Sequence, residues 1–99
     1  MRFTLSNDFR CNGHRFKKGD PIELLPTTGT ALLLKTEDTE FPVGPHVFNF
    51  LNEVESPSID TLTEWFHEMI CESPTGHLVE SDGTGPDGFH SWFVYLGMI

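Results

Sequence analysis

The stretch Ser58–Glu72, SIDTLTEWFHEMICE, has the clearest helical periodicity in the chain. At about 100° per residue, one side of a helix here carries apolar side chains. They are Ile59, Leu62, Phe66, Met69 and Ile70, with Trp65 at the margin. Ser56 or Ser58 suits the start of such a helix as a cap, and Pro74 lies beyond its end. The pattern predicts one main amphipathic helix over about residues 58–72, packed on the rest of the fold through its apolar side.

The opposite side of this predicted helix is acidic. Asp60, Glu64, Glu68 and Glu72 follow one another at intervals of four residues, and the stretch contains no Lys or Arg. Four residues rise about 6 Å along a helix, so the carboxylates form a slanted row. Like charges at this spacing disfavour a helix by a few tenths of a kcal/mol per pair. The row is either an ordinary solvated face or a surface that binds a basic partner.

Length and charge restrict the classes of protein. Ninety-nine residues predict a single domain, 1–99. The net charge of −9 is unevenly distributed, since residues 1–19 carry +4 and residues 20–99 carry −13, with Lys35 as their only base. This polarity opposes direct binding to nucleic acid or to an anionic membrane, and it favours a basic protein partner. Solubility is the simpler explanation of the same acidity.

The N-terminal half predicts short antiparallel strands. Asn12-Gly13 suits a two-residue type I′ turn, which would place Phe9–Cys11 opposite His14–Phe16. Three further short segments between turn signals have strand patterns. They are Arg2–Leu5, Pro21–Leu25 and Ala31–Lys35. We therefore predict an α+β fold, with a small antiparallel sheet or half-open barrel on which the helix of residues 58–72 packs.

The remaining segments predict smaller elements. Pro45 suits the first turn of a short helix near residues 45–54, where Val47, Phe50, Leu51 and Val54 share one side. Residues 77–80 predict a brief strand, and residues 36–40 and 81–89 predict loops. Residues 91–99 fit a strand by their aromatic content, or a helix that begins at Ser91 and ends at Gly97.

Two cysteine–histidine pairs provide a candidate metal site. Cys11 and His14 flank the predicted turn, and His67 and Cys71 lie one helical turn apart, so the four could bind zinc. A gap of 52 residues separates the pairs, which is far too long for a zinc finger, and we expect neither metal nor cofactor. Two distant cysteines do not indicate a disulfide framework. The sequence shows no signal peptide and no apolar run long enough to span a membrane, so we expect a cytoplasmic protein.

Other chemistry finds little support in the sequence. Glu80, Asp82 and Asp87 surround a Gly-rich loop, but their spacing does not match a calcium-binding loop, which leaves turn formation as the simpler interpretation. The sequence contains no P-loop, nucleophile elbow, H-E-x-x-H or dinucleotide-binding motif. We therefore expect a protein that is not an enzyme.

In size and charge pattern the chain resembles small phage-encoded inhibitors that mimic DNA, such as some anti-CRISPR proteins. The resemblance covers the composition and the helix of residues 58–72. It implies an inhibitor that docks on a basic, nucleic-acid-binding protein. The docking residues would be Asp60, Glu64, Glu68 and Glu72, extended by Glu53 and Glu55.

Three other interpretations remain open. The chain is also compatible with a small metal-binding protein that uses Cys11, His14, His67 and Cys71, or with an assembly module that has no connection to nucleic acid. A homodimer is a third arrangement. In it, the basic N-terminal hairpin of one copy would face the acidic surface of another. The basic residues are Arg10, Arg15, Lys17 and Lys18.

Overall fold

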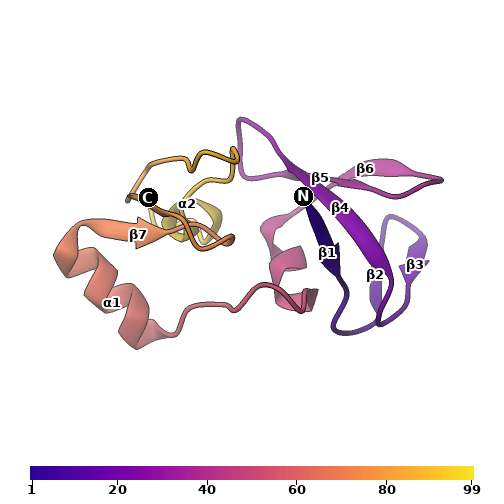
Figure 1. The fold of residues 1–99 in the computed structure, drawn as a ribbon, viewed down its shortest axis with the longest axis horizontal. Helices are drawn as coiled ribbons and strands as arrows, with labels where there is room; N and C mark the ends of the chain where they lie inside the picture. Colours follow the sequence, from indigo (N-terminus) through magenta and orange to yellow (C-terminus); the bar gives the residue numbers. More distant parts are fainter. The chain divides into compact units, whose positions relative to one another are not determined.

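A computed structural model describes residues 1–99, which form two compact units, Met1–Glu55 and Ser56–Ile99. The N-terminal unit contains strands β1 to β6 and a 3-10 helix, η1 (Figure 1). The C-terminal unit contains the main helix α1, the strands β7 and β8, and a short helix α2. All strand pairs are antiparallel and no barrel closes, so the predicted α+β class with one main helix is confirmed. The packing of the main helix on the N-terminal sheet stays a prediction.

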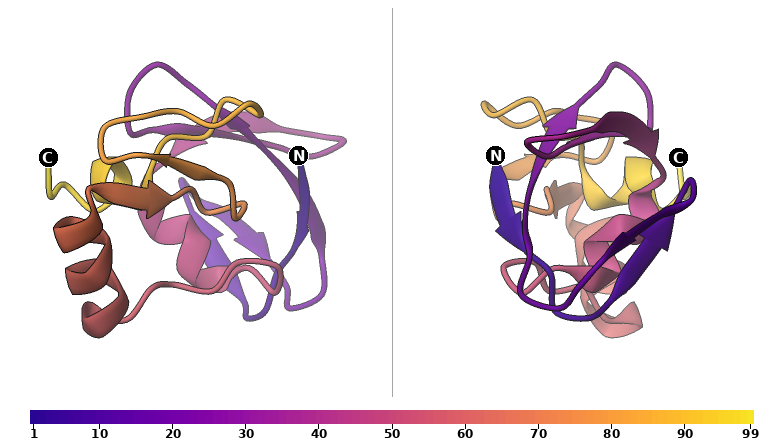
Figure 2. Two further views of the ribbon diagram at one scale, coloured as in Figure 1. Left: turned by 60° about the vertical axis from the view of Figure 1, so that its left-hand side comes forward. Right: turned by 90° about the vertical axis from the view of Figure 1, so that its right-hand side faces the viewer.

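The N-terminal sheet is built from strands that alternate between buried and exposed residues. Its order is β1 (Arg2–Thr4), β4 (Pro21–Pro26), β5 (Leu32–Lys35) and β6 (Glu40–Val43). Leu24 pairs with Leu34, which pairs with Phe41, and all three side chains are buried. This period of two confirms the predicted strands β1, β4 and β5. Figure 2 shows the twist of these strands from two further directions.

The predicted hairpin is present with its predicted register. β2 (Phe9–Cys11) pairs with β3 (His14–Phe16), so that Arg10 faces Arg15 and Cys11 faces His14. Asn12 and Gly13 have φ angles of 56° and 80°, as the type I′ turn requires. Aromatic contacts hold the hairpin within its unit, since the His14 ring stacks on Phe41 at 5.0 Å between ring centres.

The region after the turn at residues 36–39 differs from the prediction. Glu40–Val43 forms the edge strand β6, which sequence periodicity did not indicate. The helix predicted near residues 45–54 is the 3-10 helix η1 (Pro45–Phe50), which begins at Pro45 as expected but ends early. Leu51 is extended and forms a bridge with Leu5, because tertiary pairing there replaces a further helical turn.

In the C-terminal unit, α1 (Ile59–Glu68) begins as predicted and ends four residues earlier than predicted. The Ser58 side chain accepts a hydrogen bond from the Thr61 N–H and caps the helix. At the other end Met69 is left-handed, with φ at 59°. The chain then enters β7 (Ile70–Glu72), which pairs with β8 (Leu78–Glu80). The predicted helix through Glu72 is therefore wrong, because pairing with β8 takes residues 70–72 into a strand.

The C-terminal tail contains a short helix and no strand, which settles the ambiguity of the sequence. α2 (Trp92–Tyr95) is capped by Ser91, whose side chain accepts from the Val94 N–H, and Gly97 follows with φ at 71°. The Ser91 hydroxyl also donates a 2.5 Å hydrogen bond to the Ser81 carbonyl. Three of its four side chains, Trp92, Phe93 and Tyr95, are buried, as is Phe89 shortly before it. No helix in the structure is long and apolar enough to cross a membrane.

Candidate protein-binding surface

Three of the four predicted carboxylates form a row on α1. Asp60, Glu64 and Glu68 lie on successive turns of this helix, all three side chains are exposed, and none makes an ion pair. At about 1.5 Å rise per residue, successive members are about 6 Å apart along the helix axis. We call these three residues the acidic row. No Lys or Arg occurs between Ser56 and Ile99 to offset it.

The other three predicted acidic residues do not belong to this row. Glu72 is partly buried on β7, because the helix has already ended. Glu53 and Glu55 belong to the N-terminal unit. The Glu53 carboxylate accepts a 2.7 Å hydrogen bond from the Thr4 N–H. Slight burial acts to raise the pKa of Glu53, but hydrogen bonds from backbone N–H groups outweigh it and lower the pKa below its usual value. Glu53 therefore has a structural partner, whereas Glu55 is exposed.

The apolar side of α1 packs differently from the sequence-based prediction. Trp65 and Leu62 are partly buried, and the Trp65 ring meets Phe93 edge-on at 6.5 Å. Ile59, Phe66 and Met69, by contrast, are 80%, 70% and 79% exposed. The prediction that these three hold the helix against the fold is wrong, because the helix is turned so that its Trp65 side faces the interior of the unit.

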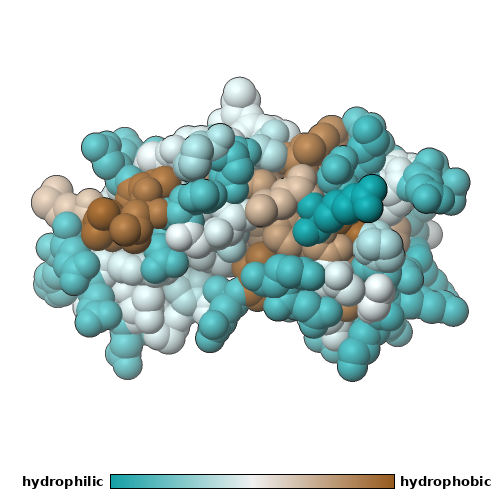
Figure 3. Space-filling view, viewed as in Figure 1, coloured by the Kyte–Doolittle hydropathy of each residue, from teal (hydrophilic) through white to brown (hydrophobic).

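Further apolar side chains extend this exposed surface onto the β7–β8 hairpin. Cys71 and Val79 point inward, which leaves Ile70 and Leu78 on the outer side, 37% and 68% exposed. Figure 3 shows hydrophobic surface gathered over β7 and the adjoining end of α1. We call this surface the exposed apolar patch. It is defined by the exposed large apolar residues of α1, its C-cap and the β7–β8 hairpin, which are Ile59, Phe66, Met69, Ile70 and Leu78. Exposed apolar residues gathered in this way typically mark interaction sites.

The four candidate zinc ligands have different environments. Cys11 and His14 face each other across the hairpin, and His67 is exposed on α1. Cys71 is fully buried on β7, where its thiol donates to the Glu72 carbonyl at 3.2 Å. The predicted helical pair of His67 and Cys71 is wrong, since α1 ends between them. No three His, Cys, Asp or Glu side chains in the structure lie together in a way that could hold a metal ion.

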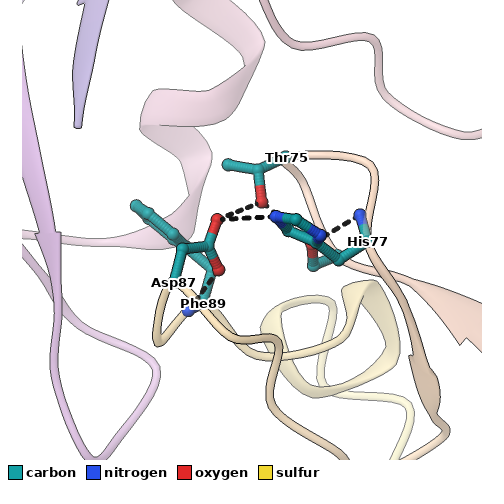
Figure 4. Close-up of polar contacts among 5 residues, drawn as sticks. Thr75, His77, Asp87 and Phe89 are labelled. Atoms are coloured by element: carbon teal, nitrogen blue, oxygen red, sulfur yellow. Dashed lines mark hydrogen bonds and ion pairs between the residues drawn. The ribbon is translucent and has the colours of Figure 1, made fainter.

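Asp87 in the Gly-rich loop is engaged in turn formation. Its Oδ2 atom accepts a 2.5 Å hydrogen bond from Thr75 and lies 3.6 Å from Nε2 of His77. Its Oδ1 atom accepts from the Phe89 N–H at 3.2 Å (Figure 4). These contacts join the turn before β8 to the loop after it. The sequence did not indicate this cluster, because Thr75 and Asp87 are twelve residues apart and match no local motif.

The N-terminal unit has an open depression of about 370 Å³ on its sheet, where opposite charges alternate. Arg2 pairs in register with Glu23, and Glu23 with Lys35. Opposite charges on neighbouring strands favour this register. The depression therefore has no strong charge of one sign that would select a ligand.

Comparison with known proteins gives no further assignment. No model of a known protein family matches the chain, and neither curated proteins nor solved structures include a significant match.

Proposed function

We propose that this protein is a non-catalytic inhibitor that docks its acidic row on the basic surface of a nucleic-acid-binding protein. The observation that carries the proposal is the acidic row itself, with three exposed carboxylates and no Lys or Arg in the same unit. Exposed helices usually mix charges of both signs, so the row is unusual for a surface that serves only solubility.

The geometry of the row suits a surface that normally binds phosphates. Each DNA strand carries one phosphate per about 3.4 Å of helix axis, and the winding path between phosphates is longer. The interval of about 6 Å between members of the acidic row is comparable with that path. Lys and Arg side chains arranged for a nucleic-acid strand could therefore meet Asp60, Glu64 and Glu68 in turn. The negative field would also accelerate encounter with a basic partner.

The proposed setting is the cytoplasm of a cell that carries a phage or a related mobile element. The resemblance of the chain in size and charge pattern to small phage-encoded inhibitors supports this setting. The two cysteines are free thiols in the structure, which suits a reducing compartment.

The test is capture of partners from a cell lysate by three tagged proteins. The first is the wild type, and the second has Asp60, Glu64 and Glu68 changed to Gln. The third removes three exposed charges from the N-terminal unit, with Glu37→Gln, Asp38→Asn and Glu40→Gln, and is the control for net charge. Captured proteins are identified by mass spectrometry and then challenged with duplex DNA.

The proposal expects a nucleic-acid-binding protein on the wild type and on the control, but not on the variant of the acidic row. Duplex DNA should release that protein at an ionic strength where salt alone does not, because both ligands occupy one surface. Equal capture by all three proteins would show that the acidic row is only a solvated face.

A further inference from the structure

The exposed half of α1 has two chemically different edges. At about 100° per residue, Ile59 and Phe66 lie within about 20° of each other, and the acidic row begins about 100° from Ile59. Thr63 and His67 lie between these edges. The helix meets the rest of its unit through a third side, where Leu62 and Trp65 are partly buried. One solvent-facing surface thus presents an apolar edge and an acidic edge, with Thr63 and His67 between them.

The apolar edge continues beyond the helix. Ile70 follows Met69 directly, and Leu78 is a diagonal neighbour of Ile70 on the outer side of the β7–β8 hairpin. Phe66, Met69 and Leu78 are each more than two thirds exposed. The exposed apolar patch therefore spans two elements of one unit and is flanked on the helix by the acidic row.

The charges decide which partner can cover this surface. Seven acidic residues and no Lys or Arg lie between Ser56 and Ile99. Two copies joined through this surface would bring two acidic rows together, which like-charge repulsion opposes. An anionic membrane and a nucleic acid are repelled in the same way. The partner must therefore combine apolar and basic groups on one surface.

We infer that α1 is the docking site for a basic amphipathic helix of a protein partner. Its apolar stripe covers the exposed apolar patch, while its Lys and Arg side chains reach Asp60, Glu64 and Glu68. A helix with apolar residues at i, i+3, i+4 and i+7 presents both chemistries along one face. The inference rests on the proposed function for the contacts of the acidic row. It adds apolar contacts, which binding through the acidic row alone does not require.

Synthetic peptides with a fluorescent label provide the test. The first peptide places Leu and Lys in an amphipathic helical pattern, and the second has the same composition in scrambled order. We expect the amphipathic peptide to bind the full chain at least about tenfold more tightly in fluorescence anisotropy, since burial of one large apolar side chain suffices for that factor. Both affinities should fall as salt is added.

Two variants separate the apolar half from the acidic half. Phe66→Ser changes a side chain that is 70% exposed, so the fold should remain, which circular dichroism verifies. It should weaken the binding of the amphipathic peptide about tenfold and leave the affinity for the scrambled peptide unchanged. Leu96→Ser changes the C-cap residue that follows α2, at a position 47% exposed, and is the matched control, which should change neither affinity. The Gln variant of the acidic row should bind both peptides more weakly than the wild type does.

The outcomes distinguish the inference from the proposed function. If the wild type bound both peptides equally and only the Gln variant lost this binding, the inference would be overturned and the proposed function would remain. If Phe66→Ser weakened peptide binding but the Gln variant of the acidic row did not, the partner would not need to be basic, which would refute that part of the inference. A dimer in light scattering that Phe66→Ser dissociates would show that a second copy covers the patch. Failure of both peptides to bind would overturn both proposals.

Discussion

Thr75 donates a 2.5 Å hydrogen bond to Asp87 across twelve residues, and this contact ties the turn before β8 to the Gly-rich loop after it. The same carboxylate accepts from the Phe89 N–H, and Phe89 is fully buried. Asp87, for which the sequence favoured turn formation over metal binding, thus connects two separate segments of the C-terminal unit.

Removal of this carboxylate should destabilise the C-terminal unit. We expect Asp87→Ala to lower the free energy of unfolding by about 1–3 kcal/mol, because the Phe89 N–H loses its acceptor. Thr75→Val should cost about 1 kcal/mol. Both tryptophans, Trp65 and Trp92, lie in this unit, so their fluorescence in a urea titration reports its unfolding. Asp82→Ala is the control and should remain within about 0.5 kcal/mol of wild type. An equal loss in the control would contradict the assigned role of Asp87.

The stability of the protein should decline at high pH through Tyr95. Burial raises the pKa of Tyr95 above its usual value, and the negative charge of Asp87 adds to this, against the opposing hydrogen bond from the His90 N–H. The folded state then holds the proton more tightly than the unfolded state. The contribution of Tyr95 is complete below about pH 10 and is lost as the pH rises through the pKa of the folded state.

This tyrosine can be titrated directly. The chain contains one tyrosine, so the ultraviolet absorbance of tyrosinate reports Tyr95 alone. We expect a higher midpoint in the folded protein than in the same chain unfolded in urea. Coincident midpoints would show that burial does not perturb the Tyr95 hydroxyl.

Two members of the acidic row should have opposite effects on the stability of α1. Asp60 lies in the first turn, where a negative charge favours the helix dipole, whereas Glu68 is the last helical residue, where a negative charge opposes it. We expect Asp60→Asn to lower and Glu68→Gln to raise the free energy of unfolding by about 0.3–1 kcal/mol each, as measured by urea titration. The Gln variant of the whole row should therefore remain close to wild type in stability. If both single variants changed the free energy of unfolding in the same direction, the cause would be a general effect of net charge and not the helix dipole.

The like-charge pair of Arg10 and Arg15 in the N-terminal hairpin should also be measurable. These residues face each other in the register of β2 and β3. Arg15→Glu replaces repulsion by attraction and should stabilise the hairpin by about 0.2–1 kcal/mol. Amide hydrogen exchange in β2 and β3 reports this local change. Lys17→Glu makes the same change of charge outside the paired strands, so an equal gain there would attribute the effect to net charge.

Local chemistry accounts for the elements that the sequence predicted correctly. The positive φ angles of Asn12 and Gly13 and the hydroxyl cap of Ser58 depend only on a few adjacent residues. The hairpin and the start of α1 could therefore be read from the sequence. The three residues of the acidic row could be predicted in the same way, because helical spacing alone places them on one side of α1.

Only the tertiary structure determined where α1 ends and which side of it is buried. Residues 70–72 have helical periodicity with α1, yet β7 pairs with β8, so Glu72 does not join the acidic row as the sequence predicted. Strand pairing and burial depend on contacts between residues distant in sequence, which local periodicity does not encode. Periodicity identified an apolar side on α1, but only packing against Phe93 shows that Trp65 faces inward while Phe66 stays exposed.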